Sequence, residues 1–74
     1  MHEVKRELLD FIVGYVARKG FPPSIRDMCA AFGWGSTNAA IENLDWLESY
    51  GYILRRRGQS RAIQILNPEF KGAR

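Results

Sequence analysis

The sequence is poor in residues that form cross-links or metal centres, since its 74 residues include one cysteine and one histidine. A single cysteine excludes an intramolecular disulfide, and with one histidine it cannot supply the four ligands of a structural zinc site. Cys29 falls at an apolar helical spacing within DMCAAF, which favours a core residue over a nucleophile. The fold must therefore depend on its hydrophobic core, and we expect neither a metal nor another cofactor.

Long apolar runs and catalytic patterns are also missing. No run of 18 apolar residues and no signal peptide is present, so the sequence predicts a soluble, cytoplasmic protein without a membrane partner. There is no glycine-rich phosphate loop, no Ser-Lys arrangement and no histidine placed near an acid in a recognisable pattern. We therefore expect a binding protein and not an enzyme.

Charges of one sign are missing from two segments. No acidic residue lies between Leu54 and Pro68, where four arginines surround a Gly-Gln-Ser turn, and residues 37–50 contain three acids but no lysine or arginine. The whole chain follows this division, because residues 1–50 carry a net charge of −2 and residues 51–74 a net charge of +5. A one-sided basic patch is typical of a protein that binds a polyanion.

Apolar residues, by contrast, are plentiful enough for one small core, at 46% hydrophobic and 12% aromatic. Their helical spacing predicts a first helix from Val4 to about Lys19. Ser24 and Asp27 form the pattern of a capping box and predict a second helix over residues 25–32. The side chains expected to face inward from these helices are Val4, Leu8, Phe11, Ile12, Tyr15, Val16, Ile25, Met28, Cys29 and Phe32.

A third helix is predicted to begin at Ser36 or Thr37 and to end at Tyr50, because Gly51 follows. Its inward stripe is Ala40, Leu44 and Leu47.

A β-hairpin is predicted after the helices, with strands near residues 52–57 and 61–66 that alternate in polarity around the turn. Three helices followed by a hairpin predict an α+β, mainly α fold of the winged helix-turn-helix type. We expect residues 1–67 to form this DNA-binding domain and residues 68–74 to form a C-terminal tail.

Four segments carry a resemblance to a known family: LLDFIVGYV, GFPPSIRDMCAAFGW, STNAAIENLDWLES and GQSRAIQIL. They resemble the N-terminal DNA-binding domain of LexA repressors, and they follow one another at that family's spacing from Glu7 to Leu66. The Pro-Pro-Ser entry to the second helix and the Ser-Arg of the hairpin are the most specific pieces. The resemblance implies a repressor-type domain that reads one operator half-site from the major groove of double-stranded DNA, with its wing on the DNA backbone.

The resemblance also implies particular contacts. Asn38 matches the N6 and N7 edge of adenine, Glu42 can accept from the N4 amino group of cytosine, and Ala39 can lie against a thymine methyl. The hydroxyl of Ser36 and the free N–H groups at the start of the third helix can hold a phosphate. The implied base-reading residues are Ser36, Asn38, Ala39, Ile41 and Glu42, and the implied phosphate ligands are Ser60 and Arg61.

The remaining arginines of the hairpin allow two interpretations. Cations on an exposed edge strand can simply discourage aggregation. A helix-turn-helix immediately before them favours phosphate contact instead. Because successive strand residues point to opposite faces, we predict Arg57 and Arg61 as phosphate ligands, followed by Arg55, which shares the face of Arg57.

Two departures from the LexA pattern affect these expectations. The family continues into a self-cleaving peptidase domain, whereas this sequence stops at Arg74, so we expect self-cleavage and the usual dimerisation surface to be missing. Ile41 is apolar where the family commonly has a polar residue, so the preferred operator is expected to differ.

Two partner questions stay open at this stage. Asp45 and Glu48 are expected to tilt away from a groove that Glu42 approaches, because recognition helices enter by their N-terminal ends. Trp46 and Tyr50 either flank the core or form an exposed aromatic patch. The main hypothesis is a transcription regulator that pairs as a weak homodimer on DNA. The alternative is an adaptor that binds another repressor or the transcription machinery, either through Trp46 and Tyr50 or through the acidic residues of the third helix.

Overall fold

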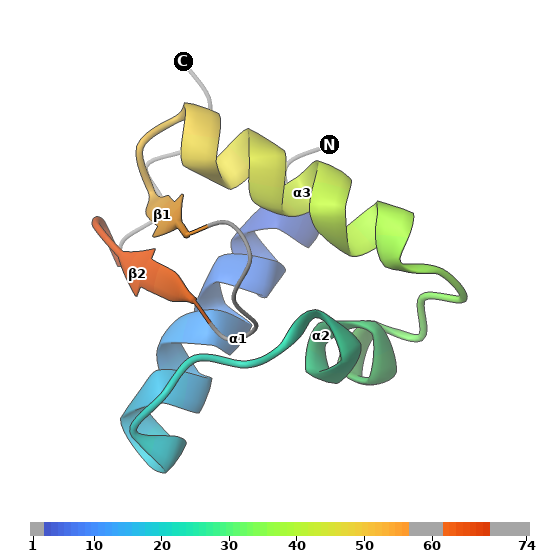
Figure 1. The fold of residues 1–74 in the computed structure, drawn as a ribbon, viewed down its shortest axis with the longest axis horizontal. Helices are drawn as coiled ribbons and strands as arrows, with labels where there is room; N and C mark the ends of the chain where they lie inside the picture. Colours follow the sequence, from blue (N-terminus) through green and yellow to red (C-terminus); the bar gives the residue numbers. More distant parts are fainter. Residues whose placement is uncertain (1–2, 57–61, 69–74) are drawn as a thin grey trace.

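The computed structural model of the chain describes residues 3–56 and 62–68. Within these residues it contains three helices and a two-stranded antiparallel hairpin around one core (Figure 1). The elements are α1 (Glu3–Lys19), α2 (Ile25–Phe32), α3 (Thr37–Ser49), β1 (Ile53–Arg55) and β2 (Ile63–Ile65). This is the predicted winged helix-turn-helix, in which α2 and α3 form the helix-turn-helix and the β1–β2 hairpin forms the wing.

Helix α1 packs against α3 through one apolar face. Leu8, Leu9 and Ile12 are fully buried on this face, and Leu9 widens the stripe that the sequence predicts. Val4 was expected to face inward but is 42% exposed, because it lies in the first turn, before the part of the helix that the core covers. No helix in the described part of the chain is both long and apolar enough to cross a membrane.

Helix α2 begins and ends at the predicted residues, and its start is fixed by reciprocal capping. The Ser24 hydroxyl accepts from the Asp27 N–H at 3.1 Å, and the Asp27 carboxylate accepts from the Ser24 N–H at 2.9 Å. The same carboxylate oxygen also accepts from the Tyr15 hydroxyl at 3.1 Å. The capping box that local sequence predicts therefore also ties α2 to α1.

Helix α3 ends in a Schellman motif at Gly51. The Gly51 N–H donates to the Glu48 carbonyl and the Tyr52 N–H donates to the Leu47 carbonyl, at 3.1 and 2.9 Å. Gly51 has φ of 84°, a left-handed conformation that residues with a Cβ rarely adopt. This motif turns the chain from α3 directly into the hairpin.

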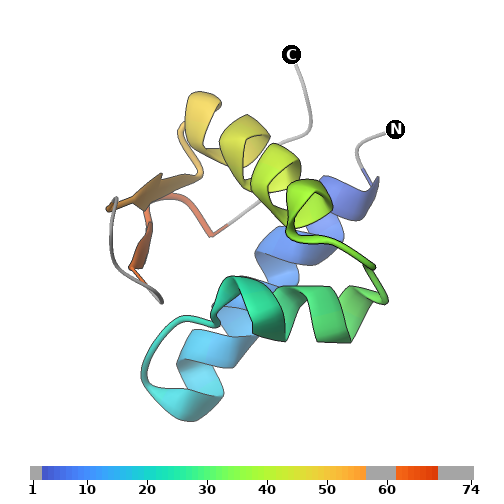
Figure 2. The same ribbon diagram turned by 45° about the vertical axis from the view of Figure 1, so that its right-hand side comes forward.

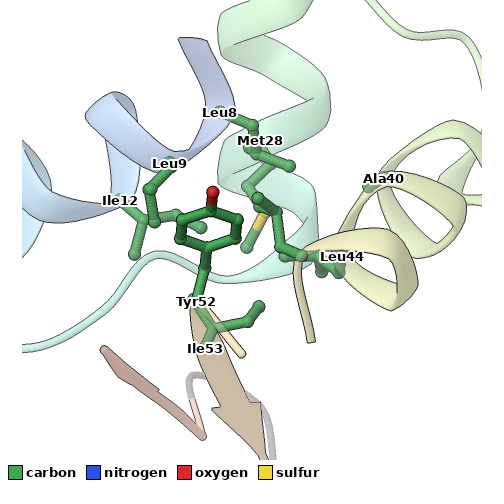
Figure 3. Packing of buried hydrophobic residues seen from close by; sticks show 9 residues of the cluster. Leu8, Leu9, Ile12, Met28, Ala40, Leu44, Tyr52 and Ile53 are labelled. Carbon is green, nitrogen blue, oxygen red and sulfur yellow. The ribbon is translucent and has the colours of Figure 1, made fainter. Parts of the chain in front are cut away.

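The core lies where α1, α2, α3 and the start of the hairpin meet. The predicted inward stripe of α3 is fully buried, and Figure 3 shows the Tyr52 ring directed into this cluster. Burying one such aliphatic side chain contributes about 1.5–3 kcal/mol, so the cluster dominates the stability of so small a domain. Its members are Leu8, Leu9, Ile12, Met28, Ala40, Leu44, Leu47, Tyr52 and Ile53.

The hairpin pairs Ile53 with Ile65 and Arg55 with Ile63. Its described strands are three residues each, shorter than predicted, although further hydrogen bonds extend the pairing at both ends. At its base the Tyr52 carbonyl accepts from the N–H groups of Leu66 and Asn67, at 2.8 and 3.1 Å. Toward the tip, the Arg56 N–H donates to the Ala62 carbonyl at 2.9 Å.

Candidate nucleic-acid interface

The turn between α2 and α3 is held by local contacts. Gly33 adopts φ of 72°, and the Trp34 N–H donates to the Cys29 carbonyl at 3.0 Å. Trp34 stacks on Phe32, with ring centroids 4.8 Å apart. The Cys29 thiol, partly buried against the core as predicted, donates to the Ser36 carbonyl at 3.5 Å. These contacts fix where α3 begins, and Figure 2 shows α2 and α3 joined at this end, away from the hairpin.

The start of α3 presents open polar groups. Ser36 is the N-cap residue and is exposed, and its side chain accepts no capping hydrogen bond from a described backbone N–H. Its hydroxyl and the first N–H groups of the helix therefore keep unused hydrogen-bonding capacity. The N-terminus of a helix also carries partial positive charge, so this end of α3 is suited to a phosphate group.

Four residues of α3 form what we call its outward face: Asn38, Glu42, Asp45 and Ser49. All four are exposed, and their spacing of three or four places them in line, opposite the buried stripe. The half-buried residues Ala39 and Ile41 flank this face on its two sides. The structure thus brings the predicted base-reading residues together at the N-terminal half of α3.

Asn38 differs from a second asparagine on the same helix. The side-chain amide of Asn43 donates to the Ala39 carbonyl at 2.8 Å, so this group is used within α3. Asn38 instead lies on the outward face with its side chain exposed. Of the two side chains, that of Asn38 is the more exposed.

The acids in the C-terminal half of α3 are bound by an arginine of the wing. The Arg55 guanidinium forms ion pairs with Asp45 and, through Nε, with Glu48 at 3.0 Å. The second oxygen of Glu48 accepts from the backbone N–H of Arg55 at 3.3 Å. Sequence reasoning missed this cluster. The only signal of this cluster in the sequence is a pair of acids at helical spacing that is followed, just after a glycine turn, by a cation.

Three of the four predicted phosphate ligands, Arg57, Ser60 and Arg61, lie outside the described residues, so their contacts stay predictions. The fourth, Arg55, is engaged by carboxylates, and its role toward phosphate is likewise untested. The neighbouring Arg56 is exposed and shares its side of β1 with Leu54, which is 41% exposed. Arg56, which directly follows β1, is therefore an exposed cation of the described chain that is not among the predicted phosphate ligands.

Trp46 and Tyr50, at the C-terminal end of α3, each fit a different one of the two interpretations. Trp46 is partly buried, packs against the core and has the Lys5 ammonium 5.5 Å from its ring centroid. Tyr50 stacks on Trp46 with ring centroids 4.2 Å apart, yet it is 50% exposed. Trp46 therefore flanks the core, and Tyr50 contributes the exposed part of the pair.

Comparison with known proteins agrees with this geometry. The family model for the LexA DNA binding domain matches residues 2–62. The chain is 44% identical over 61 residues to the LexA repressor of Moorella thermoacetica, covering 82% of this chain and 30% of that protein. It is 41% identical over 69 residues to the LexA repressor of a Geobacillus species, covering 93% of this chain and 33% of the relative.

The chain thus spans about a third of the length of these curated relatives. The matched segment includes all three helices and the first strand of the hairpin. The described fold and a family match over most of its length lead to one conclusion: this chain belongs to the LexA DNA-binding domain family.

Proposed function

We propose that this protein is a sequence-specific double-stranded DNA-binding transcriptional repressor. In this proposal α3 reads one operator half-site from the major groove, and the wing contacts the DNA backbone. The observation that carries it is the outward face of α3, where exposed polar side chains begin at the helix N-terminus and the opposite face is buried. Family membership supports the same function, because the matched relatives are LexA repressors.

Base reading falls to the N-terminal half of α3. Asn38 donates to and accepts from adenine, and Glu42, one turn later on the same face, accepts from cytosine. Each well-placed pair of this kind discriminates against a wrong base by about 1–3 kcal/mol. Ala39 and Ile41 flank these two residues and offer apolar contacts, so we expect thymine methyls to be favoured beside them.

Backbone contacts orient the domain on the duplex. Ser36 and the N–H groups of the first turn hold one phosphate, and Ser60, Arg61 and Arg57 of the wing hold others. Arg55 was predicted as a further phosphate ligand, but in the free protein it binds two carboxylates. Arg55 is therefore not counted among the phosphate contacts of this proposal.

A salt titration tests the proposal. With about four to six phosphates neutralised, the logarithm of the affinity should fall against the logarithm of salt concentration with a slope of about −4 to −5. Selection from a random DNA pool should in parallel yield one preferred half-site. A flat, weak salt dependence together with no enriched sequence would contradict both parts of the proposal.

A second candidate function rests on Tyr50, which is half exposed beside Trp46. Exposed tyrosines are enriched at protein–protein interfaces, so this pair would suit an adaptor that binds another protein. The same titration separates the two functions, because an adaptor should show weak DNA binding with little salt dependence. The substitution Tyr50→Ala should leave the affinity for a duplex with a single half-site unchanged if the repressor function holds.

A further inference from the structure

The geometry points to Arg55 as a positioning residue that holds the wing against α3, and not as a phosphate ligand. This inference rests on the proposed DNA-binding function, because what Arg55 positions is the wing that contacts the DNA backbone. Arg55 is the last residue of β1, and Arg57, Ser60 and Arg61 follow it within six residues along the sequence. A group that orients β1 therefore influences every predicted phosphate ligand of the wing.

Glu48 holds both the side chain and the backbone of Arg55. One carboxylate oxygen binds Nε at 3.0 Å, and the other accepts from the backbone N–H at 3.3 Å. The side chains are 23% exposed for Arg55 and 31% for Glu48, so water screens this pair less than a fully exposed one. Two contacts from one carboxylate restrict the strand as well as the guanidinium, which a side-chain pair alone would not do.

The charge pattern of α3 favours this contact. Asp45 and Glu48 lie in the last turns of the helix, where the negative end of the helix dipole disfavours acids. Since α3 contains no lysine or arginine, it cannot compensate these charges itself. Arg55 supplies the missing cation from the neighbouring strand, and the wing thereby becomes the electrostatic partner of the C-terminal half of α3.

Arg55 already binds these partners through Nε and one terminal nitrogen, so a phosphate on its remaining N–H groups would lie close to both carboxylates. Repulsion between these two carboxylates and the phosphate would oppose the gain from one phosphate contact. Arg56 has no such conflict, because it is exposed and the alternation of an extended chain places it on the face opposite to Arg55. It therefore provides a matched control that carries the same charge one residue away.

The decisive variant is Glu48→Gln, because the two roles of Arg55 predict opposite changes in its affinity for the operator. If Arg55 positions the wing, Glu48→Gln should weaken binding to the selected operator by about threefold to tenfold, with an unchanged salt slope. If Arg55 is a phosphate ligand, the same variant removes a negative charge and frees the guanidinium. Affinity should then rise, and that result would overturn the inference.

Arg55→Ala provides the second arm. It should weaken operator binding to a similar extent without changing the salt slope, and the double variant with Glu48→Gln should be no weaker than Arg55→Ala alone. A slope reduced by about one in magnitude would assign Arg55 to the phosphate backbone. Additive losses would show that Arg55 and Glu48 act independently, and either result would overturn the inference. Arg55→Lys, which keeps the charge but not the Nε contact, should recover only part of the affinity.

Folding is monitored by urea denaturation of each variant without DNA. If Arg55→Ala does not fold, the direction of the affinity change in Glu48→Gln still distinguishes the two roles of Arg55. Arg56→Ala should keep the wild-type unfolding midpoint, whereas Glu48→Gln and Arg55→Ala should lower it to a similar extent. A midpoint unchanged in both latter variants would overturn the inference. Wild-type protein that binds no duplex at any salt concentration would instead overturn the proposed function.

Discussion

Asp27 connects two helices through a single carboxylate. It completes the capping box of α2 and accepts from the Tyr15 hydroxyl of α1, with the shorter of these bonds at 2.9 Å. Because the helix-turn-helix begins at this cap, the orientation of α2 relative to α1 depends on Asp27. The effects of changing this side chain should therefore extend beyond the first turn of α2.

Asp27→Ala should lower the free energy of unfolding by about 1–3 kcal/mol, because it removes both the cap and the link to α1. Tyr15→Phe removes only the hydroxyl contact and should cost about 0.5–1.5 kcal/mol. Urea denaturation followed by circular dichroism measures both. Equal losses in the two variants would mean that the capping contacts contribute nothing measurable.

Asn38→Ala should weaken binding to the selected half-site by about 1–3 kcal/mol and binding to random DNA very little. The reason is that an adenine contact carries sequence information, whereas a phosphate contact does not. Asn43→Ala is the matched control, since its amide binds the Ala39 carbonyl, and it should preserve the ratio of specific to random affinity. Fluorescence anisotropy with both kinds of duplex gives this ratio, and equal losses on the two would reassign Asn38 to the backbone.

At the scale of elements, the parts that sequence predicted well are those with local causes. The bounds of α2 follow from a proline pair, a capping box and Gly33, all of which act within a few residues. The stripe of α3 follows from helical periodicity. These features need no knowledge of what the element packs against, and the structure confirms them.

The parts that sequence missed depend on contacts between elements. Arg55 was interpreted with its neighbouring arginines as part of a basic tip, because nothing local reveals that α3 returns two carboxylates to it. Val4 has the right spacing for the core but lies where α1 is not covered. Charge and periodicity indicate which groups are available for pairing, but tertiary packing determines which of them come into contact.

Gly14 and Gly51 should respond in opposite ways to substitution by alanine. Gly14 lies inside α1, and a Cβ there would meet the Arg18 side chain at an ordinary 3.5 Å, so Gly14→Ala should stabilise the fold by about 0.5–1 kcal/mol. Gly51 has φ of 84°, and although no described atom lies within 4 Å of its Cβ position, Gly51→Ala should cost about 1–2 kcal/mol of backbone strain. Thermal unfolding checks both signs, and a neutral Gly51→Ala would show that the Schellman turn relaxes freely.

For the whole molecule, one recognition helix limits how much sequence can be read. A single module reads about three to five base pairs, too few to be found among the competing sites of a genome. We therefore propose that two copies of this chain occupy one palindromic operator, because twofold pairing of modules calls for twofold symmetry in the DNA. The exposed Tyr50 offers a contact for such a pair.

The free chain is expected to be monomeric at micromolar concentration and to pair on DNA. Filling of two half-sites about one helical turn apart should be cooperative, with a coupling of about 1–3 kcal/mol. Titration of duplexes with one and with two half-sites measures this coupling. Independent filling would refute pairing on DNA, and a stable dimer in sedimentation without DNA would reveal an interface formed before binding.

The base of the hairpin is closed by a residue that is itself anchored in the core. The Tyr52 ring is buried, and its carbonyl accepts from both Leu66 and Asn67, the last residues before the described chain ends at Pro68. A pulling force applied to the chain beyond Pro68 would thus load these two bonds first. Behind them, Tyr52 passes the load into the cluster formed by all three helices. In mechanical terms, Tyr52 anchors the C-terminal side of this domain. Tension is therefore transmitted to the core before it reaches the tip of the wing.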